Sequence, residues 1–470
     1  MPMSDKQHLS PSRRRFLKTG ALAGAAGLWT AKPALAMTSP QTGGRSGQAR
    51  NVIFMVADGM CHGTLGLAHH WQLKHRGERL SWIQLYDRPD LHSALQDTAS
   101  ASSPVTDSAA AASAWGSGRR VPNGQINITA EGSSLKPILR YAKDAGMATG
   151  LVSTCRITHA TPAGFATAVA DRDEEDSIAR QYLEAEVDVL LGGGYRHFKN
   201  EEQDLLPAYA EAGYRLCREV ADLRGANRAA KLLGLFSRSH IPYALDRKND
   251  RSLKVVPGLA DMMRSSLQSL AGRDEGFFLQ VEGGRVDHAG HANDPGAILH
   301  ELLEFDACIP IALRFLERNP DTLLIVTTDH GTGGCQLNGW GDSYNDSGPA
   351  LDRINRLTYS FEWLEKHYRA SGQFTAEPLV KATGIEPLPE QATAMQAAID
   401  DPELKYLTSR IAEIFEPQLK EMTATGWTST KHTGENVELL AFGAGAAPVR
   451  GYLKNYEMFK VVTDALGLRT

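Results

Sequence analysis

The sequence predicts an α/β protein with a mostly parallel central sheet and helices on both faces. Three largely apolar runs, 51–57, 276–281 and 322–328, are rich in valine, isoleucine, leucine and phenylalanine. Such runs are typical of strands that are buried on both faces, as strands of parallel sheets are. Apolar residues recur at helical spacing between them, as over 302–316, and this alternation favours a layered α/β architecture. Further strands are predicted at 148–153, 187–191 and 437–442.

The first 36 residues predict a twin-arginine export signal. Residues 12–18 contain three consecutive arginines, residues 19–28 are mildly apolar, and 34–36 has the small residues of a cleavage site. The apolar part is far shorter than the roughly 20 residues that span a bilayer, so we expect no membrane anchor. A basic disordered tail is the alternative. We therefore expect export by the twin-arginine machinery to the periplasm or the medium, with residues 37–50 as a flexible linker after cleavage.

The composition is that of a soluble globular enzyme, with 42% hydrophobic and 22% charged residues. Residues 1–36 carry six basic side chains and one acidic one, so their removal changes the net charge from −5 to about −10. No basic stripe remains, and we expect no nucleic-acid partner. The length allows one large domain or several smaller ones. We favour a single catalytic domain over 51–470.

Side chains that suit metal ligation follow the three central strands. Asp58 follows the first, the segment 282–291 follows the second, and Asp329 with His330 follows the third. In open α/β sheets, functional groups gather beyond the carboxyl ends of such strands. Carboxylates mixed with imidazoles favour a zinc-like ion with a magnesium-like neighbour. Taken alone, a pair such as Asp329-His330 after a strand is more often a cap or a satisfied polar pair than a metal site, so the prediction depends on the conjunction of the clusters.

A serine at the start of an alanine-rich segment is the candidate nucleophile. Ser108 begins the segment 108–115, whose composition has high helix propensity. At a helix N-terminus, the free backbone N–H groups and the helix dipole favour a phosphate or an alkoxide. An adjacent metal ion can activate the hydroxyl by lowering its pKa. The alternative is that Asp107 or Ser108 serves only as the N-cap.

These residues resemble the motifs of the alkaline phosphatases and occur in that family's order. The matches extend from about residue 51 to about residue 445, nearly the whole mature chain. They are Asp58-Gly-Met, Thr106-Asp-Ser108-Ala-Ala, His159-Ala-Thr161-Pro-Ala, Arg172, Glu282-Gly-Gly-Arg-Val-Asp287-His288-Ala-Gly-His291, Thr328-Asp329-His330-Gly and His432-Thr-Gly-Glu. The resemblance implies an alkaline-phosphatase-like fold and a metal-dependent phosphate monoester hydrolase of broad specificity.

The resemblance also implies two zinc ions and one magnesium ion near Ser108. Ser108 would attack the phosphate monoester, and the resulting phosphoserine would be hydrolysed to inorganic phosphate. The implied ligands are Asp287, His291 and His432 for one zinc, Asp58, Asp329 and His330 for the other, and Asp58, Thr161 and Glu282 for magnesium.

Arg172 would hold two phosphoryl oxygens, a role that suits the planar guanidinium group. By sequence alone it lies in a charged turn that we expect to be exposed, and Arg156 and Arg285 are rivals. His159 and His288 stand where some bacterial family members have Asp and Lys. An imidazole at either place would change the charge around the third ion, which leaves the identity and occupancy of that site open; the alternative is that the two histidines only hydrogen-bond a carboxylate or water.

Two other functions fit part of the pattern. A phosphodiesterase or sulfatase of the same superfamily also pairs metals with a nucleophile, although no Cys-x-Pro-x-Arg or Ser-x-Pro-x-Arg segment occurs. An exported protein that binds metal or phosphate without catalysis is the second alternative, although it would need neither Ser108 nor Arg172. The resemblance allows a homodimer, but the sequence predicts no interface.

An insertion is predicted at about 336–430, where aromatic residues occur among Gly, Asn, Asp and Ser. A connection of this length is usually a lid, a substrate-facing insertion or an oligomer contact, and a packed peripheral subdomain is the alternative. Five scattered cysteines allow one or two disulfides and leave at least one free thiol, with Cys308 expected to be buried. They are Cys61, Cys155, Cys217, Cys308 and Cys335.

Overall fold

The computed structural model of the 470-residue chain describes residues 49–226 and 229–470. The predicted signal peptide and residues 37–48 of the predicted linker lie outside the described residues. The last two linker residues are held by the core, because Ala49 N donates to Ala465 O and Arg50 N donates to Asp321 O, both at 2.7 Å. Over the part of the chain that is described, no helix is both long and apolar enough to cross a membrane.

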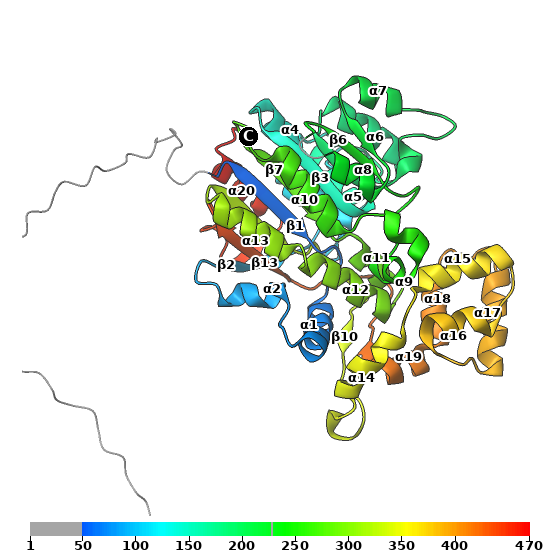
Figure 1. The fold of residues 1–470 in the computed structure, drawn as a ribbon. Helices are drawn as coiled ribbons and strands as arrows, with labels where there is room; N and C mark the ends of the chain where they lie inside the picture. The colour runs from blue at the N-terminus through cyan, green and yellow to red at the C-terminus, as the bar shows by residue number, and fades with distance from the viewer. Residues whose placement is uncertain (1–48, 227–228) are drawn as a thin grey trace, which may run out of the picture. The chain divides into compact units, whose positions relative to one another are not determined.

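A ten-stranded sheet lies at the centre of the fold, in the order β14-β2-β13-β8-β1-β7-β3-β4-β6-β5 (Figure 1). β13 pairs antiparallel with β2 and β8, and the other pairs are parallel. The predicted α/β class is therefore confirmed. The strands are β1 (Asn51–Val56), β2 (His92–Asp97), β3 (Ala148–Arg156), β4 (Val189–Gly193), β5 (Arg215–Cys217), β6 (Leu232–Leu235), β7 (Phe277–Glu282), β8 (Thr322–Thr327), β13 (Val437–Gly443) and β14 (Gly451–Lys454).

The three strands predicted to precede the metal ligands are neighbours in this sheet. β1 lies between β8 and β7, with Asn51 opposite both Thr322 and Phe277. Because the three strands run parallel and in register, their carboxyl ends reach the same edge, where Val56 lies opposite Glu282 and Thr327. This register brings the loops after β1, β7 and β8 together.

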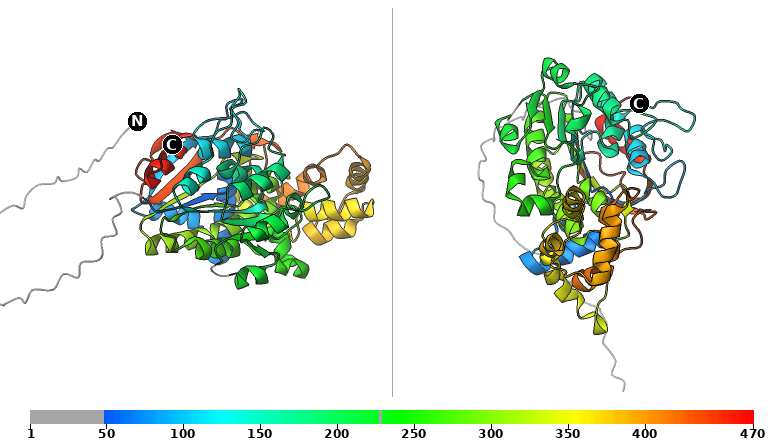
Figure 2. Two further views of the ribbon diagram at one scale, coloured as in Figure 1. Left: turned by 90° about the horizontal axis from the view of Figure 1, so that it is seen from above. Right: turned by 90° about the vertical axis from the view of Figure 1, so that its right-hand side faces the viewer.

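Two hydrophobic cores form on the two faces of the sheet, each covered by helices (Figure 2). β1 contributes to both because successive side chains of a strand point to opposite faces: Ile53 and Met55 join one core, and Val52 and Phe54 the other. The first core includes residues of α1 (His62–Arg76), α10 (Leu259–Leu270), α12 (Pro295–Asp306) and α13 (Ile309–Arg318). The second includes residues of α3 (Ser108–Ser117), α4 (Ile138–Asp144), α5 (Ala160–Ala166), α6 (Glu175–Glu184) and α20 (Glu457–Leu466).

The helical periodicity over 302–316 belongs to two helices, because α12 ends at Asp306 and α13 begins at Ile309. Pro310 lacks a backbone N–H, so it is tolerated in the first turn of α13 but would break a continuous helix. Cys308 is fully buried at this junction, as predicted. All five cysteines are buried and unpaired, so the expectation of a free thiol is confirmed and no disulfide forms among them.

A helical insertion, residues 338–424, lies between β10 (Gln336–Leu337) and β11 (Thr425–Gly426) (Figure 1). These short strands pair antiparallel, with Leu337 opposite Thr425, so the two ends of the insertion are adjacent. Phe361, Leu364 and Tyr368 are among its buried residues. Its helices are α14 (Ser347–Arg353), α15 (Phe361–Ser371), α16 (Ala376–Thr383), α17 (Pro389–Asp400), α18 (Leu407–Ile414) and α19 (Glu416–Thr423).

The remaining elements are short and lie mostly in connections. The α-helices are α2 (Ser81–Gln84), α7 (Leu206–Glu211), α8 (Val220–Gly225), α9 (Ala244–Asn249) and α11 (Arg285–His291), and the two strands are β9 (Gly331–Thr332) and β12 (His432–Thr433). The 3-10 helices are η1 (Leu85–Asp87), η2 (Tyr195–His197), η3 (Arg251–Val255), η4 (Asp342–Tyr344) and η5 (Ile354–Arg356). Of these, α11, η2 and the β9–β12 pair matter most for the site.

Candidate active site

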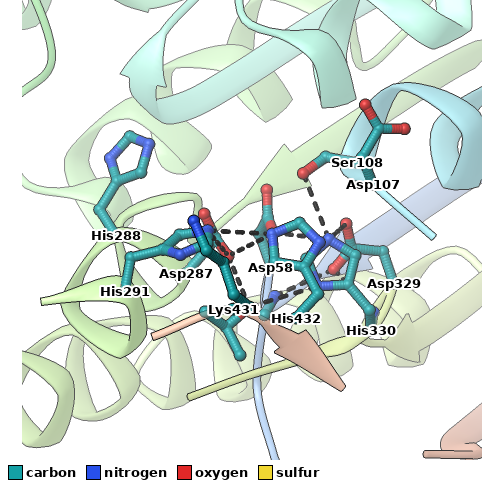
Figure 3. Close-up of polar contacts among 12 residues, drawn as sticks. Asp58, Asp107, Ser108, Asp287, His288, His291, Asp329, His330, Lys431 and His432 are labelled. Atoms are coloured by element: carbon teal, nitrogen blue, oxygen red, sulfur yellow. Dashed lines mark hydrogen bonds and ion pairs between the residues drawn. The ribbon is translucent and has the colours of Figure 1, made fainter. Parts of the chain in front are cut away.

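Four carboxylates converge at the carboxyl ends of β1, β7 and β8, and Asp58, Asp287 and Asp329 are labelled in Figure 3. Asp58 follows β1 by two residues, Glu282 ends β7, Asp329 follows β8 and Asp287 lies on α11. At most 4% of any of these residues is exposed. Four acidic groups buried at one place require compensating positive charge.

The turn after Asp58 requires a glycine. Gly59 has φ +70°, and its N–H donates to Asp329 Oδ1 at 3.0 Å. A Cβ at this position would lie 2.6 Å from Asp287 Cα. Glycine therefore allows the loop after β1 to approach both the loop after β8 and helix α11.

Three histidines direct a ring nitrogen into this cluster. His291 Nδ1 donates to Thr430 O at 2.7 Å, and His432 Nδ1 donates to Thr106 O at 2.8 Å. Their Nε2 atoms then carry lone pairs, yet they face each other at 3.0 Å. His330 Nδ1 lies 3.3 Å from Thr332 Oγ1, and its Nε2 lies 3.0 Å from Asp329 Oδ2. Two facing lone pairs repel unless a cation lies between or beside them.

The donor atoms fit metal ions. Three sets each bring one ligand atom per residue within 4.8 Å of one another: Asp287, His291 and His432; Asp58, Asp287 and His330; and Asp58, His159 and Glu282. Asp58 Oδ1 and both Glu282 oxygens in these sets, and Asp329 Oδ2 beside them, are buried and have no hydrogen-bond partner among the described residues. Buried carboxylate oxygens without donors are expected where a cation binds.

The sets agree in part with the ligands that the resemblance implied. The first set is identical to one implied zinc site. In the second, Asp287 occurs where Asp329 was expected, although Asp329 also touches His330 Nε2. In the third, Thr161 approaches through a hydrogen bond, because its Oγ1 donates to Asp58 Oδ2 at 3.1 Å.

Without cations, burial and neighbouring charges shift the pKa values of the clustered carboxyl groups. Burial, and then the neighbouring Asp329 and Asp287, raise the pKa of Asp58 well above its usual range. Burial also raises the pKa of Glu282 to about 7. For Asp287, burial acts in the same direction, but His291 and His432 outweigh it and hold the pKa well below the usual value.

Ser108 is the first residue of α3 and is 1% exposed. Its Oγ lies 3.3 Å from His330 Nε2 (Figure 3). Asp107 is the N-cap, since its Oδ1 accepts from Ala110 N at 2.9 Å, so the capping role belongs to Asp107 and leaves the Ser108 hydroxyl free of it. Ser108 therefore lies at a helix N-terminus beside the candidate metal ligands, as predicted.

Arg172 was expected to be exposed, but only 21% of its side chain is accessible to solvent. Its Nη1 donates to Asp107 Oδ2 at 3.0 Å and its Nη2 donates to His159 Nε2 at 3.3 Å. The long-range contact with Asp107 draws this charged side chain out of its turn and toward Ser108. A guanidinium that is hydrogen-bonded to the carboxylate of Asp107, the residue before Ser108, is well placed to bind a phosphoryl group there.

The two rival arginines have other partners. Arg156 Nε donates to Glu175 at 2.8 Å. Arg285 is 2% exposed, pairs with Glu362 of the helical insertion and lies 3.8 Å from the ring centroid of Tyr243. Both are held by ion pairs away from Asp107, so Arg172 has the better position beside Ser108.

His159 and His288 each accept a hydrogen bond from an arginine. Arg172 donates to His159 Nε2, and Arg285 Nη1 donates to His288 Nδ1 at 2.9 Å. Burial and Arg172 keep the pKa of His159 well below its usual value, and burial and Arg285 lower that of His288 to about 3. Both rings are therefore neutral acceptors. Cys155 could join them as a ligand set, but Arg285 already occupies His288 Nδ1.

Sequence reasoning missed two residues of the site. Thr332 Oγ1 donates to Asp287 Oδ1 at 2.6 Å and also approaches His330, so it links β9 to helix α11. Its place two residues after Asp329-His330 was the available signal. His240 stacks edge-on against His288, with ring centroids 4.3 Å apart, but it lies in a loop with no motif around it.

Comparison with known proteins agrees with this geometry. The family model described as "Alkaline phosphatase" matches residues 49–468. "Alkaline phosphatase 3" of Bacillus subtilis is 31% identical and covers 90% of each chain. "Streptomycin-6-phosphate phosphatase" of Streptomyces griseus is 30% identical and covers 96% of this chain and 98% of its own. The crystal structure of Thermus thermophilus alkaline phosphatase superposes with a TM-score of 0.82 at 35% identity, covering 90% of this chain and 93% of its own.

The match extends over almost all of the described chain, and the carboxylates, imidazoles and serine lie together in it. A phosphomonoesterase activity that depends on metal ions follows from membership of this family. The chain belongs to the alkaline phosphatase family.

Proposed function

We propose that this protein hydrolyses a broad range of phosphate monoesters through a phosphoserine on Ser108 and releases inorganic phosphate. The observation that carries this proposal is the Ser108 hydroxyl, which lies 3.3 Å from His330 at the point where the candidate ligand sets meet. The N-terminus of the ten-residue helix α3 adds backbone donors and a favourable dipole for a phosphoryl group.

The donor chemistry supports two zinc ions and one magnesium ion. Asp287, His291 and His432 would hold one zinc, and Asp58, Asp329 and His330 the other, because mixed imidazole and carboxylate ligation suits zinc. Asp58, Thr161 and Glu282 provide only oxygens, which suits magnesium, although His159 belongs to the third set and leaves that ion open. When bound, the metals would neutralise charge and lower the pKa of coordinated oxygens.

The side chains of the protein provide the nucleophile and hold the phosphoryl group. The Ser108 Oγ attacks phosphorus as the bond from phosphorus to the ester oxygen breaks; the hydroxyl proton is lost to solvent, and the departing alkoxide takes up one proton to leave as the alcohol. Arg172 holds two phosphoryl oxygens with its planar fork, while Asp107 fixes the orientation of that fork. Water then attacks the phosphoserine and regenerates the Ser108 hydroxyl, so that two displacements at phosphorus release alcohol and phosphate.

Replacing Arg172 with lysine is expected to lower kcat/KM for an aryl phosphate by roughly 10- to 100-fold and to weaken inhibition by inorganic phosphate. Lysine keeps the charge but cannot make two parallel N–H···O bonds. The exposed Arg119, changed to lysine, is the matched control and should behave as the unmodified enzyme. Steady-state kinetics that show full activity for the Arg172→Lys enzyme would remove Arg172 from the phosphate site.

The substrate class is tested by comparing an aryl phosphate, a bis-aryl phosphate and an aryl sulfate at alkaline pH. The protein is first stripped of metal, and zinc and magnesium are then added back separately and together. We expect turnover that requires zinc and is concentrated on the monoester. A preference for the diester or the sulfate would overturn the monoesterase proposal, and a lack of turnover with all three would favour the non-catalytic binding protein.

The alcohol side of the substrate is the open part of this proposal. The Streptomyces griseus relative is named for one phosphate ester, streptomycin 6-phosphate. Broad specificity rests on the recognition of the phosphoryl group by Ser108, Arg172 and the ligand sets. It would be contradicted if kcat/KM fell by orders of magnitude between simple aryl and alkyl phosphates.

We further propose export by the twin-arginine route, which moves folded proteins, to the periplasm or the medium. The support is the sequence of residues 1–36 alone. A variant with Arg13→Lys and Arg14→Lys should accumulate inside the cell, and undiminished activity in the periplasm would contradict the proposal. A homodimer is proposed by analogy with the family, and light scattering after size-exclusion chromatography tests it.

A further inference from the structure

A cleft of about 720 Å³ leads from Ser108 to the helical insertion. Its lining includes Ser108 and Arg172 as well as Lys405 and Tyr406, which precede α18. Binding sites for small organic molecules are typically about 300–1,000 Å³, whereas a phosphoryl group fills only a small part of such a volume. The rest of the cleft is therefore available to the alcohol part of the substrate.

Six lysine and arginine side chains line this cleft. Three of them are neutralised by the ion pairs described above, which join Arg156 to Glu175, Arg172 to Asp107 and Arg285 to Glu362. The other three make no ion pair with any residue in 49–226 or 229–470. They are Arg196 in η2, Lys405 beside α18 and Lys431 before the candidate ligand His432. Lys431 and His432 are labelled in Figure 3.

The acidic residues of the cleft do not balance these three cations. Glu175 and Glu362 are already paired, and Asp287 belongs to the metal ligands. Glu365 lies 3.9 Å from Arg369 and accepts from Leu407 N at 3.2 Å. Asp173 alone is uncommitted among the described residues that line the cleft, so three free cations face one free carboxylate.

We infer that Arg196, Lys405 and Lys431 form a leaving-group subsite that selects phosphate monoesters whose alcohol part carries additional negative charge. This inference rests on the proposed function, since it concerns the substrate of the same site. Cations along a cleft with low-dielectric walls attract and hold an anionic ligand more strongly than cations on an open surface. A second phosphate or a carboxylate on the alcohol would provide the missing counter-charge.

The surroundings of two of the cations support a binding role. Arg196 is half-buried, and its only side-chain hydrogen bond within the described chain runs from Nε to His197 Nε2 at 3.0 Å, which leaves both terminal nitrogens free. Lys405 Nζ lies 5.2 Å from the ring centroid of Tyr406, and Tyr406 is 57% exposed. The Lys405–Tyr406 pair therefore presents a cation and a ring together to the cleft.

The test compares phenyl phosphate with 4-(carboxymethyl)phenyl phosphate. The two phenols have similar acidity because a methylene group separates the carboxylate from the ring, so the substrates differ mainly in the charge of the alcohol. The measured quantity is the selectivity ratio, kcat/KM for the charged substrate divided by kcat/KM for phenyl phosphate. The variants are Lys405→Gln, Arg196→Gln and the double variant, all in the metal-loaded, full-length mature protein.

We expect the double variant to lower the selectivity ratio by roughly threefold to tenfold, with kcat/KM for phenyl phosphate within about twofold of the unmodified enzyme. High salt should lower the ratio of the unmodified enzyme toward that of the variant, because salt screens these charges. Lys454→Gln is the matched control, since Lys454 is exposed, lies 5.9 Å from the ring of Tyr456 and is absent from the cleft lining.

The outcomes separate the subsite from the activity. An unchanged ratio in the double variant, or an equal fall for both substrates, would overturn the subsite and leave the phosphomonoesterase proposal intact. A fall of the same size in Lys454→Gln would also overturn the subsite, because a general field would then explain it. Failure of the unmodified enzyme to hydrolyse phenyl phosphate with zinc and magnesium would instead overturn the proposed function.

Discussion

Replacing Ser108 with alanine is expected to abolish the phosphoenzyme and to lower kcat/KM for an aryl phosphate by about a thousandfold or more. Among the described residues, Ser108 is the hydroxyl that hydrogen-bonds His330 Nε2, and it does so from the first turn of α3. Acid quenching followed by peptide mass spectrometry measures the phosphoserine, and steady-state kinetics measure the loss.

The metal content of the Ser108→Ala protein should remain that of the unmodified protein, because the candidate ligand sets consist of carboxylates and imidazoles. Ser117→Ala is the matched control. Ser117 is half-buried and donates to Ser113 O at 2.8 Å, but it is the last residue of α3 and is absent from the cleft lining. A Ser108→Ala enzyme that still forms a phosphoenzyme on this helix, or keeps its turnover, would place the nucleophile elsewhere.

Removal of the metal ions is expected to lower the Tm by about 10 °C or more at pH 8. The four buried carboxylates would then repel one another, and the unpartnered oxygens of Asp58, Glu282 and Asp329 would be left buried without compensation. Calorimetry before and after chelation, with zinc and magnesium restored as the control, measures the difference. Equal Tm values would mean that these groups find other partners.

This destabilisation should grow as the pH rises. The pKa of Glu282 is raised from 4.5 to about 7, so the folded metal-free protein binds this proton more tightly than the unfolded chain. Its contribution to the free energy of unfolding is therefore zero below about pH 4, falls between pH 4.5 and 7, and then stays low. Asp58 acts in the same direction, whereas the contribution of Asp287, whose pKa is lowered, is complete above about pH 5.

Glu282→Gln removes this titration. The metal-free variant should be more stable than the metal-free parent at pH 8, by roughly 1.4 kcal/mol for each pKa unit of the shift, and the two should converge near pH 4. Glu211→Gln, at the exposed end of α7, should change neither curve. A Glu282→Gln protein that is less stable than its parent at pH 8 would show that the carboxylate stabilises the fold without metal.

The central strands and the ligand cluster could be predicted from sequence because both depend on local patterns. Buried parallel strands are continuous apolar runs, and β1, β7 and β8 end where Asp58, Glu282 and Asp329 occur. Parallel register then brings those loops to one edge without further information. The position of Ser108 at the start of α3 likewise follows from the alanine-rich segment after it.

The rest depends on contacts between residues far apart in the chain. The expected exposure of Arg172 was wrong because Asp107, 65 residues away, pairs with it. His240 reaches the site from a loop whose sequence has no motif. The break between α12 and α13 could have been predicted from Pro310, but the apolar periodicity concealed it. The cations that face the cleft from outside the motifs could be identified only after their ion-pair partners were known.

The pairing of β10 with β11 has a consequence for how this enzyme can change. Because Leu337 and Thr425 face each other, the chain leaves for the helical insertion and returns at nearly the same point. A segment with adjacent ends can be lengthened, trimmed or exchanged without moving the strands that hold the reactive groups. Lys405 and Tyr406 belong to the insertion, while Ser108 and the ligand cluster do not. Mutations in the insertion can therefore change substrate selectivity while the reactive groups stay as they are, both in natural evolution and in engineering.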